Sequence, residues 1–283
     1  MKKILSLLFV TMFILCALCA CGTDSTGDSN NDTGKKENAG SFDTTAKADE
    51  SMFEWDGNLI TAITSDGAKK ESVLIPARCE GFSGVVFQET EIKHVAFEDN
   101  DDIALDFAFM GADKIVSVKL PSEITIIPSM AFQGCKTLNE IVLPAEVVTL
   151  EGYSFSGCVS LEKLVFEGNK LTAIGENCFE GCAALKSVTI PNGVTSIEKY
   201  AFADCTSLGE IVLSDTVKNI AKFAFGNTGI KEIHFPAGIQ FETMDASAFG
   251  TTAYTTVIYI VKDSWCDQNQ EKWNIGFSEV KYE

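Results

Sequence analysis

The sequence predicts an elongated solenoid of stacked coils, in which short parallel strands form a ladder along one side. Three observations predict it. A phenylalanine returns at intervals of 23, 23, 24, 23, 23 and 24 residues, a short alternating apolar segment precedes each copy, and a small residue stands before each phenylalanine. One such unit cannot bury its own apolar stripe, so successive units have to stack. The phenylalanines are Phe109, Phe132, Phe155, Phe179, Phe202, Phe225 and Phe249.

The expected strands lie in segments where apolar and polar residues alternate. Alternation with β-branched residues is typical of strands, and the proline that follows several of these segments ends them. Parallel strands of successive coils would lie about 4.8 Å apart. The segments are IKHVAFE (92–98), IVSVKLP (115–121), LNEIVLP (138–144), LEKLVFE (161–167), LKSVTIP (185–191), LGEIVLS (208–214), IKEIHFP (230–236) and YTTVIYI (254–260).

The turn after each phenylalanine also repeats. The residue before it is small, as a tight corner requires, and the residue two positions after it tolerates a left-handed backbone in every copy except the last. These later residues are Gly111, Gly134, Gly157, Gly181, Asp204, Asn227 and Thr251.

The repeated pattern resembles the BspA-like subclass of bacterial leucine-rich repeats. The matching motif is L-x-x-I-x-I/L-P, followed by V-T-x-I and A-F-x-G-C, over roughly residues 52–275. The resemblance implies a leucine-rich repeat solenoid with an adhesion-type role, whose ligands are host or matrix proteins, other cells or wall polymers. The first coil departs from the pattern, because Asp101 and Ala104 stand where later coils have apolar residues, and we expect it to be irregular.

The resemblance also predicts a cap at each end of the repeats. Residues 51–91 would form the N-terminal cap, with a β-hairpin in 53–76, and residues 92–260 the repeats. Residues 261–283 would form the C-terminal cap, with a short helix in 261–273 that Asp263 or Ser264 caps. Trp265, Trp273 and Phe277 would shield the last coil.

The first fifty residues predict export and anchoring. Residues 1–20 have the two lysines and the apolar run of a secretory signal. Leu18-Cys19-Ala20-Cys21 resembles a lipobox, which makes Cys21 the lipidated residue and residues 21–50, rich in polar side chains, a disordered tether. We therefore expect a protein anchored by lipid to the outer face of the bacterial cell membrane and facing the cell surface.

The charge of the chain argues against nucleic acid as a partner. Forty acidic residues stand against 22 lysines and arginines, which gives a formal net charge of -18, and no basic patch is visible. A surface of this charge repels DNA, RNA and anionic lipid. Contact with the membrane is therefore expected through the lipid anchor only.

A column of cysteines follows the phenylalanines. Three positions after each phenylalanine stand Ala112, Cys135, Cys158, Cys182, Cys205, Thr228 and Thr252. Small residues replace cysteine where it is missing, which indicates selection for volume. Thiols stepping about 4.8 Å along a straight ladder cannot converge on a tetrahedral metal. We expect packed free thiols, with a single disulfide between neighbouring coils as the alternative.

No other residues indicate catalysis, a metal or a cofactor. The two histidines, His94 and His234, lie six coils apart, or roughly 29 Å, and cannot share a site. The acidic run at 98–102 invites a calcium hypothesis, but it lacks the glycine and the distal glutamate of a calcium loop. We therefore expect a protein that is not an enzyme.

The outward side chains of the strands are the candidate binding surface, which we call the ribbon. Its central column is predicted to run through Ala96, Lys119, Val142, Val165, Thr189, Val212, His234 and Ile258, and its flanking column through His94, Ser117, Glu140, Lys163, Ser187, Glu210, Glu232 and Thr256. The central column is apolar in part and the C-terminal half of the flanking column is acidic, which is typical of partner sites.

The residues predicted to contact a partner, either a protein or a wall or host polysaccharide, are Lys119, Glu140, Val142, Lys163, Val165, Thr189, Glu210, Val212, Glu232 and His234. The alternative is that valine merely favours strands. The chain would then be a structural spacer of the cell envelope without a dedicated ligand.

Overall fold

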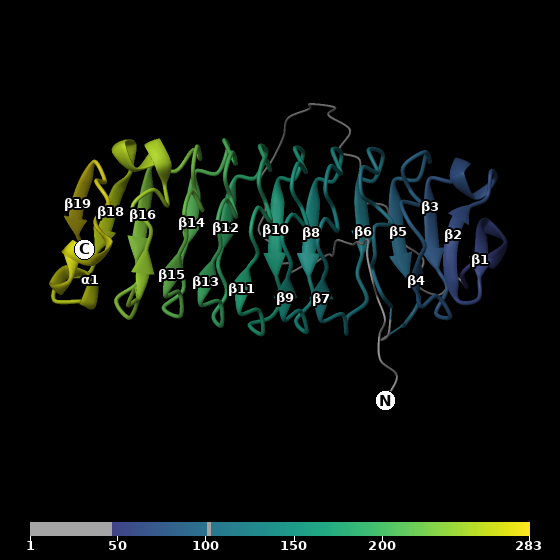
Figure 1. Ribbon diagram of the computed structural model, residues 1–283, viewed down its shortest axis with the longest axis horizontal. Helices are drawn as coiled ribbons and strands as arrows, with labels where there is room; N and C mark the ends of the chain where they lie inside the picture. The colour runs from purple at the N-terminus through teal and green to yellow at the C-terminus, as the bar shows by residue number, and fades with distance from the viewer. Residues whose placement is uncertain (1–46, 101–102) are drawn as a thin grey trace, which may run out of the picture.

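The computed structural model describes residues 47–100 and 103–283 of the chain. Coils lie side by side along the long axis of the body, from β1 (Phe53–Asp56) at one end to β19 (Glu279–Tyr282) at the other (Figure 1). The predicted leucine-rich repeat solenoid is confirmed. The predicted signal peptide, Cys21 and most of the tether fall in residues 1–46, outside the described residues, as do Asp101 and Asp102.

The first ladder carries the ribbon. Its strands pair in parallel with the next coil, and the register sets Lys163 beside Glu140 and Val165 beside Val142. Three groups of hydrogen-bonded strands follow one another along the body. They are β3 (Ser72–Ile75), β5 (His94–Phe97) and β6 (Ser117–Lys119); β8 (Glu140–Leu143) and β10 (Lys163–Phe166); and β12 (Ser187–Thr189), β14 (Glu210–Val212), β16 (Glu232–Phe235), β18 (Val257–Ile260) and β19.

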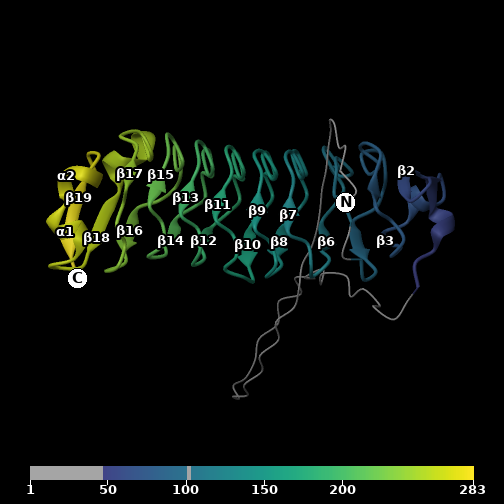
Figure 2. The same ribbon diagram turned by 60° about the horizontal axis from the view of Figure 1, so that its bottom comes forward.

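A second ladder of two-residue strands forms another side of each coil. Figure 2 shows this row apart from the first. It is a single six-stranded parallel sheet. Its strands are β7 (Ile126–Ile127), β9 (Thr149–Leu150), β11 (Ala173–Ile174), β13 (Ser196–Ile197), β15 (Asn219–Ile220) and β17 (Thr243–Met244). One residue of each strand is buried, such as Ile174 and Ile197, and these residues close the core that the first ladder begins.

The marker phenylalanines form one continuous buried file. Consecutive rings from Phe109 to Phe249 are stacked with centroids 4.4 to 6.4 Å apart, and all seven are fully buried. The predicted alignment of the coils is therefore confirmed. Phe87 extends the file by one ring, 4.2 Å from Phe109. Its shorter interval and its neighbour Val86, in place of a small residue, hid it in the sequence.

Each regular coil makes two left-handed turns, of which the sequence revealed one. Gly111, Gly134, Gly157, Gly181, Asp204 and Asn227 have positive φ as predicted, and in the last coil Gly250 takes this role instead of Thr251. A second column of positive φ lies two residues before the phenylalanines, at Phe107, Met130, Tyr153, Asn177, Tyr200 and Phe223. A left-handed conformation costs about 1–2 kcal/mol at such residues. Nothing in their side chains announces it.

The two end coils differ from the predicted register. In the first coil Leu105 is buried while Ala104 is exposed, so the irregularity predicted there is present. In the last coil the prediction was wrong by one residue. Tyr259, not Ile258, lies beside His234, and Val257, not Thr256, lies beside Glu232. The 3-10 helix η3 (Gly250–Thr255) occupies the turn before this strand, and Thr256 and Ile258 are buried beneath it.

The N-terminal end contains an antiparallel pair. β1 pairs with β2 (Leu59–Ile63), and β2 pairs in parallel with β4 (Gly81–Phe82). β3 does not join this hairpin, although the prediction placed residues 53–76 within it. It pairs in parallel with β5, because its alternating residues match the coil pattern, and the ladder therefore begins before residue 92. The 3-10 helices η1 (Glu50–Met52) and η2 (Gly67–Lys69) flank the pair.

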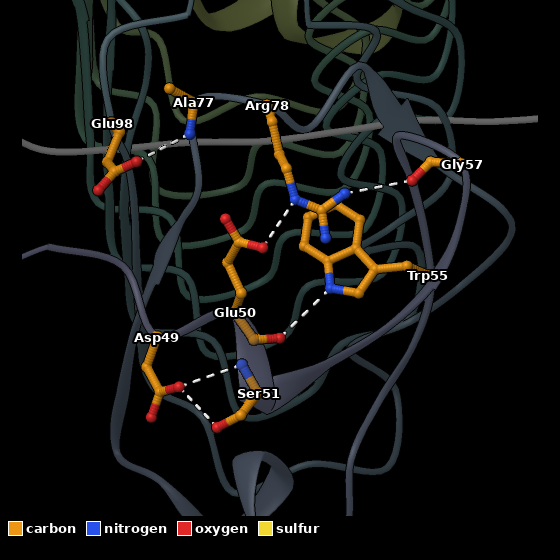
Figure 3. Close-up of polar contacts among 8 residues, drawn as sticks. All are labelled: Asp49, Glu50, Ser51, Trp55, Gly57, Ala77, Arg78 and Glu98. Carbon is orange, nitrogen blue, oxygen red and sulfur yellow. Dashed lines mark hydrogen bonds and ion pairs between the residues drawn. The ribbon is translucent and has the colours of Figure 1, made fainter.

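Polar contacts fix the chain where it enters the solenoid (Figure 3). The Arg78 guanidinium lies 3.4 Å over the Trp55 ring and 2.8 Å from a Glu50 carboxylate oxygen. The Trp55 indole also donates to the Glu50 carbonyl. Glu98 accepts from the backbone N–H groups of Ala48 and Ala77, and these two hydrogen bonds lower the pKa of its carboxyl.

The C-terminal end combines two short helices with a strand that the sequence did not predict. The Ser264 side chain caps α1 (Trp265–Gln268) by accepting from the Asp267 N–H, and α2 (Gln270–Trp273) follows. Trp273 is fully buried against Phe235, with ring centroids 5.2 Å apart. β19 then adds one more parallel strand to β18. Within the described ranges, no helix is long and apolar enough to cross a bilayer.

Candidate binding surface

The structure brings the predicted contact residues together along one ladder. Lys119, Lys163, Thr189, Glu210, Glu232 and His234 are exposed, whereas Glu140 and Val165 are half-buried. The valines of the central column differ widely. Val142 retains 9% of its surface and Val212 retains 46%. The ribbon is therefore most open as an apolar surface near β14.

The middle of the ribbon is neutralised by ion pairs within the chain. Lys163 contacts the Glu140 carboxylate on the neighbouring strand, and Lys186 contacts Glu162 in the same manner one coil later. Opposite charges side by side in a sheet stabilise it, whereas like charges in the same places destabilise it. The middle of the ribbon thus uses its charges on itself.

The C-terminal half contains a shallow depression of about 450 Å³. Its lining consists of Gly209, Glu210, Ile211, Val212, Lys231, Glu232 and His234, all from β14, β16 and the residues just before them. Because Val212 lies beside His234, the flanking residues Glu210 and Glu232, two positions earlier, are also neighbours. Two carboxylates therefore border an apolar floor.

Aromatic side chains continue the central column beyond this depression. His234 stacks on Tyr259 with ring centroids 4.4 Å apart, and its Nδ1 lies 2.8 Å from a Glu283 carboxylate oxygen. The Tyr259 hydroxyl donates to Glu232 at 3.4 Å. Sequence reasoning missed Tyr259 and Glu283. The alternation Val257-Ile258-Tyr259-Ile260 supports either register, and Glu283 follows a strand that was not predicted.

The cysteine column is buried within the coils. Cys135, Cys158, Cys182 and Cys205 are fully buried, and each thiol donates to the carbonyl of a phenylalanine one coil earlier, at 3.0 to 3.3 Å. All seven described cysteines are free. The thiols therefore fill a small-residue column, as predicted, and satisfy a backbone acceptor as well.

Burial also makes these thiols poor nucleophiles. It raises the pKa of Cys178 to about 12 and the pKa of Cys158 well above its usual range. The same cause raises the pKa of Cys79 to about 11. The reactive species is the thiolate, so these side chains stay protonated and unreactive at neutral pH.

Comparison with known proteins identifies the repeat. The family described as "BspA type Leucine rich repeat region" matches residues 66–183 and 125–256, with six copies of the repeat. The chain belongs to this family. A search of the curated proteins found no match.

Solved structures of bacterial leucine-rich repeat proteins share the fold. One from Bacteroides ovatus is 20% identical, with a TM-score of 0.55, over 79% of this chain and 64% of that one. Another from Eubacterium ventriosum is 18% identical, with a TM-score of 0.48, over 63% of this chain and 58% of that one. The chain thus spans less than two thirds of the length of either.

A BspA type solenoid of this kind is typically a binding scaffold. In the described part of the chain, no three histidine, cysteine, aspartate or glutamate side chains gather closely enough to hold a metal ion. Of the acidic run proposed for calcium, Glu98 already accepts two backbone N–H groups, and Asp101 and Asp102 lie outside the described residues. His94 lies 2.7 Å from the Ser117 hydroxyl, on the ribbon and far from His234 along the ladder.

Proposed function

We propose that the protein is a lipid-anchored cell-surface adhesion protein that binds another macromolecule through the ribbon. The observation that supports this most is the continuous, outward-facing ladder, because parallel register keeps its side chains in rows at a constant spacing. Such rows form an extended surface that an elongated partner can follow across several coils. The expected partners remain proteins and wall or host polysaccharides.

The test is capture of the partner on intact cells. Crosslinking with the chain at its natural location should yield one saturable partner. Replacing Val142, Val165 and Val212 with lysine should abolish its capture, because three cations would then occupy the central column. A spacer without a dedicated ligand gives no saturable partner, and that result would reject the proposal.

A matched variant controls for the added charge. Val148→Lys, Thr172→Lys and Thr195→Lys add the same three cations at exposed positions of or beside the second ladder. They should leave capture unchanged. Equal loss in both triple variants would mean that charge alone, and not the ribbon, governs binding.

Anchoring has a separate test. Cys21→Ser should release the protein into the medium, because it removes the thiol that would carry the lipid. Retention of this variant in the membrane fraction would contradict the lipid anchor and leave the binding proposal unaffected.

A further inference from the structure

The flanking column of the ribbon changes its electrostatic pattern between β10 and β14. Glu140 has Lys163 as its neighbour, but Glu210 has Glu232. Like charges directly opposite each other on adjacent strands are destabilising. No ion pair involves either carboxylate within the described residues, and only the Tyr259 hydroxyl donates to Glu232. The fold does not need this arrangement, since a lysine at either position would relieve it.

The glycine in this depression is also unexplained by the fold. Gly209 occupies a column that holds Asn139, Glu162, Lys186 and Lys231 in other coils. A Cβ at Gly209 would meet a single atom within 4 Å, the Ser207 carbonyl oxygen at 3.9 Å, and the backbone has no positive φ there. Gly168 and Gly193 differ, since a Cβ there would come within 2.2 Å of backbone oxygens. The missing side chain at Gly209 opens the depression and serves no visible packing role.

The depression combines three features that a basic side chain would use. Glu210 and Glu232 supply carboxylate oxygens about one strand spacing, or 4.8 Å, apart. Val212 supplies an exposed apolar floor for an aliphatic stem. Lys231 also lines the depression but forms no ion pair with either carboxylate in the described structure. Two carboxylates against one ammonium leave the site acidic.

We propose that this depression binds an arginine side chain of an extended polypeptide partner. A guanidinium presents several N–H donors in a fixed plane and can bridge two carboxylates, which a compact ammonium does less well. The inference rests on the proposed binding function of the ribbon and deepens it. It assigns the partner to proteins with an exposed basic segment.

Two other ligands fit the site less well. A polysaccharide usually stacks on an aromatic face, but the faces of His234 and Tyr259 lie against each other, 4.4 Å apart and within 4° of parallel. A divalent cation prefers six or more oxygen ligands, and no third metal-ligating side chain joins Glu210 and Glu232 in the described part of the chain. Both remain outcomes of the test.

The experiment selects ligands without assuming their sequence. A library of random twelve-residue peptides is selected against the full chain in detergent micelles, and the affinity of the best binder is measured by fluorescence anisotropy. Selected peptides should be enriched in arginine next to apolar residues. Replacing the critical arginine with citrulline, which keeps the shape and removes the charge, should weaken binding at least about tenfold.

Four variants locate the site. Glu210→Gln with Glu232→Gln removes both charges and should weaken the selected peptide at least about tenfold, and Gly209→Lys should do the same by filling the depression. Lys231→Gln removes a competing cation and should strengthen binding about threefold. Glu123→Gln with Glu176→Gln, an equal charge change away from the ribbon, should have no effect. Thermal melts establish that each variant folds.

The inference is overturned if the selected peptides lack arginine, if the Glu210/Glu232 double variant binds them unchanged, or if binding is lost with a chelator. It also falls if the saturable partner is a polysaccharide whose capture is unchanged in that double variant. The proposed function is tested separately. A partner lost with lysines at Val142, Val165 and Val212, but insensitive to the glutamine changes, would keep the ribbon and reject the arginine site.

Discussion

The buried corner of the coils and the exposed ribbon obey different rules, although one repeat generates both. At the corner every coil from Phe109 to Phe249 repeats the same aromatic ring, fully buried. On the ribbon the corresponding positions of successive coils hold Lys119, Val142, Val165, Thr189, Val212 and His234. The corner is uniform because each ring packs on the one before it. The ribbon varies because its neighbours on one side are solvent or a partner.

This difference shows where the repeat constrains the sequence. A period alone identifies the columns that stacking requires, and departures from the period mark positions that stacking leaves free. Gly209 and the Glu210–Glu232 pair are departures of this kind. They therefore point to function more strongly than the cysteines, whose regular spacing comes from packing.

The largest expected effect challenges the buried column with pH. Burial raises the pKa of Cys178 to about 12 in the folded chain, whereas an unfolded cysteine has a pKa of about 8.5. Stability from the protonated thiol is therefore fully present below about pH 8.5 and declines as the pH rises towards 12. The free energy of unfolding should fall by about 1.4 kcal/mol per pH unit for each such thiol.

Urea unfolding between pH 7.5 and 10.5, with a reductant present, measures this decline. The loss per pH unit should exceed that of one thiol, since burial also raises the pKa of Cys135, Cys158 and Cys182. Cys178→Ala should give a shallower decline. A free energy of unfolding that is the same at pH 8.5 and 10.5 would contradict the account of the column.

The next largest effect compares a corner ring with a ribbon side chain. Phe179→Ala removes a fully buried ring between two stacked neighbours and should cost about 3–5 kcal/mol of unfolding free energy. Val212→Ala, on the exposed column, should change it by about 0.5 kcal/mol or less. Tryptophan fluorescence reports on the ends of the solenoid through Trp55 and Trp273. Similar losses for the two variants would erase the distinction between the regions.

A moderate effect tests whether the cysteine column is selected for volume. Cys182→Leu overfills a fully buried position and should cost about 1–3 kcal/mol. Cys182→Ala, which copies Ala112 of the same column, should cost less, about 1 kcal/mol. Chemical denaturation of the two variants under reducing conditions gives the order. If alanine is the more harmful change, the thiol contributes through its hydrogen bond to the Phe155 carbonyl more than through its volume.

The smallest effect on stability exchanges a charge on the ribbon. Glu210→Lys would place a cation beside Glu232, as Lys163 lies beside Glu140, and should raise the free energy of unfolding by a few tenths of a kcal/mol. The same variant should weaken an arginine-containing peptide at least about tenfold. Lys163→Glu is the reverse change and should destabilise the fold slightly. Loss of stability in Glu210→Lys would show that the acidic pair is structural.

By itself the sequence determined the period of the coils, the file of phenylalanines, the volume of the cysteine column and the family. Buried columns repeat a side chain at a fixed interval, so a linear pattern contains them. Only the tertiary structure decided that Tyr259 lies beside His234, that β19 extends the ladder, and that Glu210 faces Glu232 while Glu140 meets Lys163. These contacts join residues of different coils. Their register depends on the length of each intervening turn, which alternation along one strand does not specify.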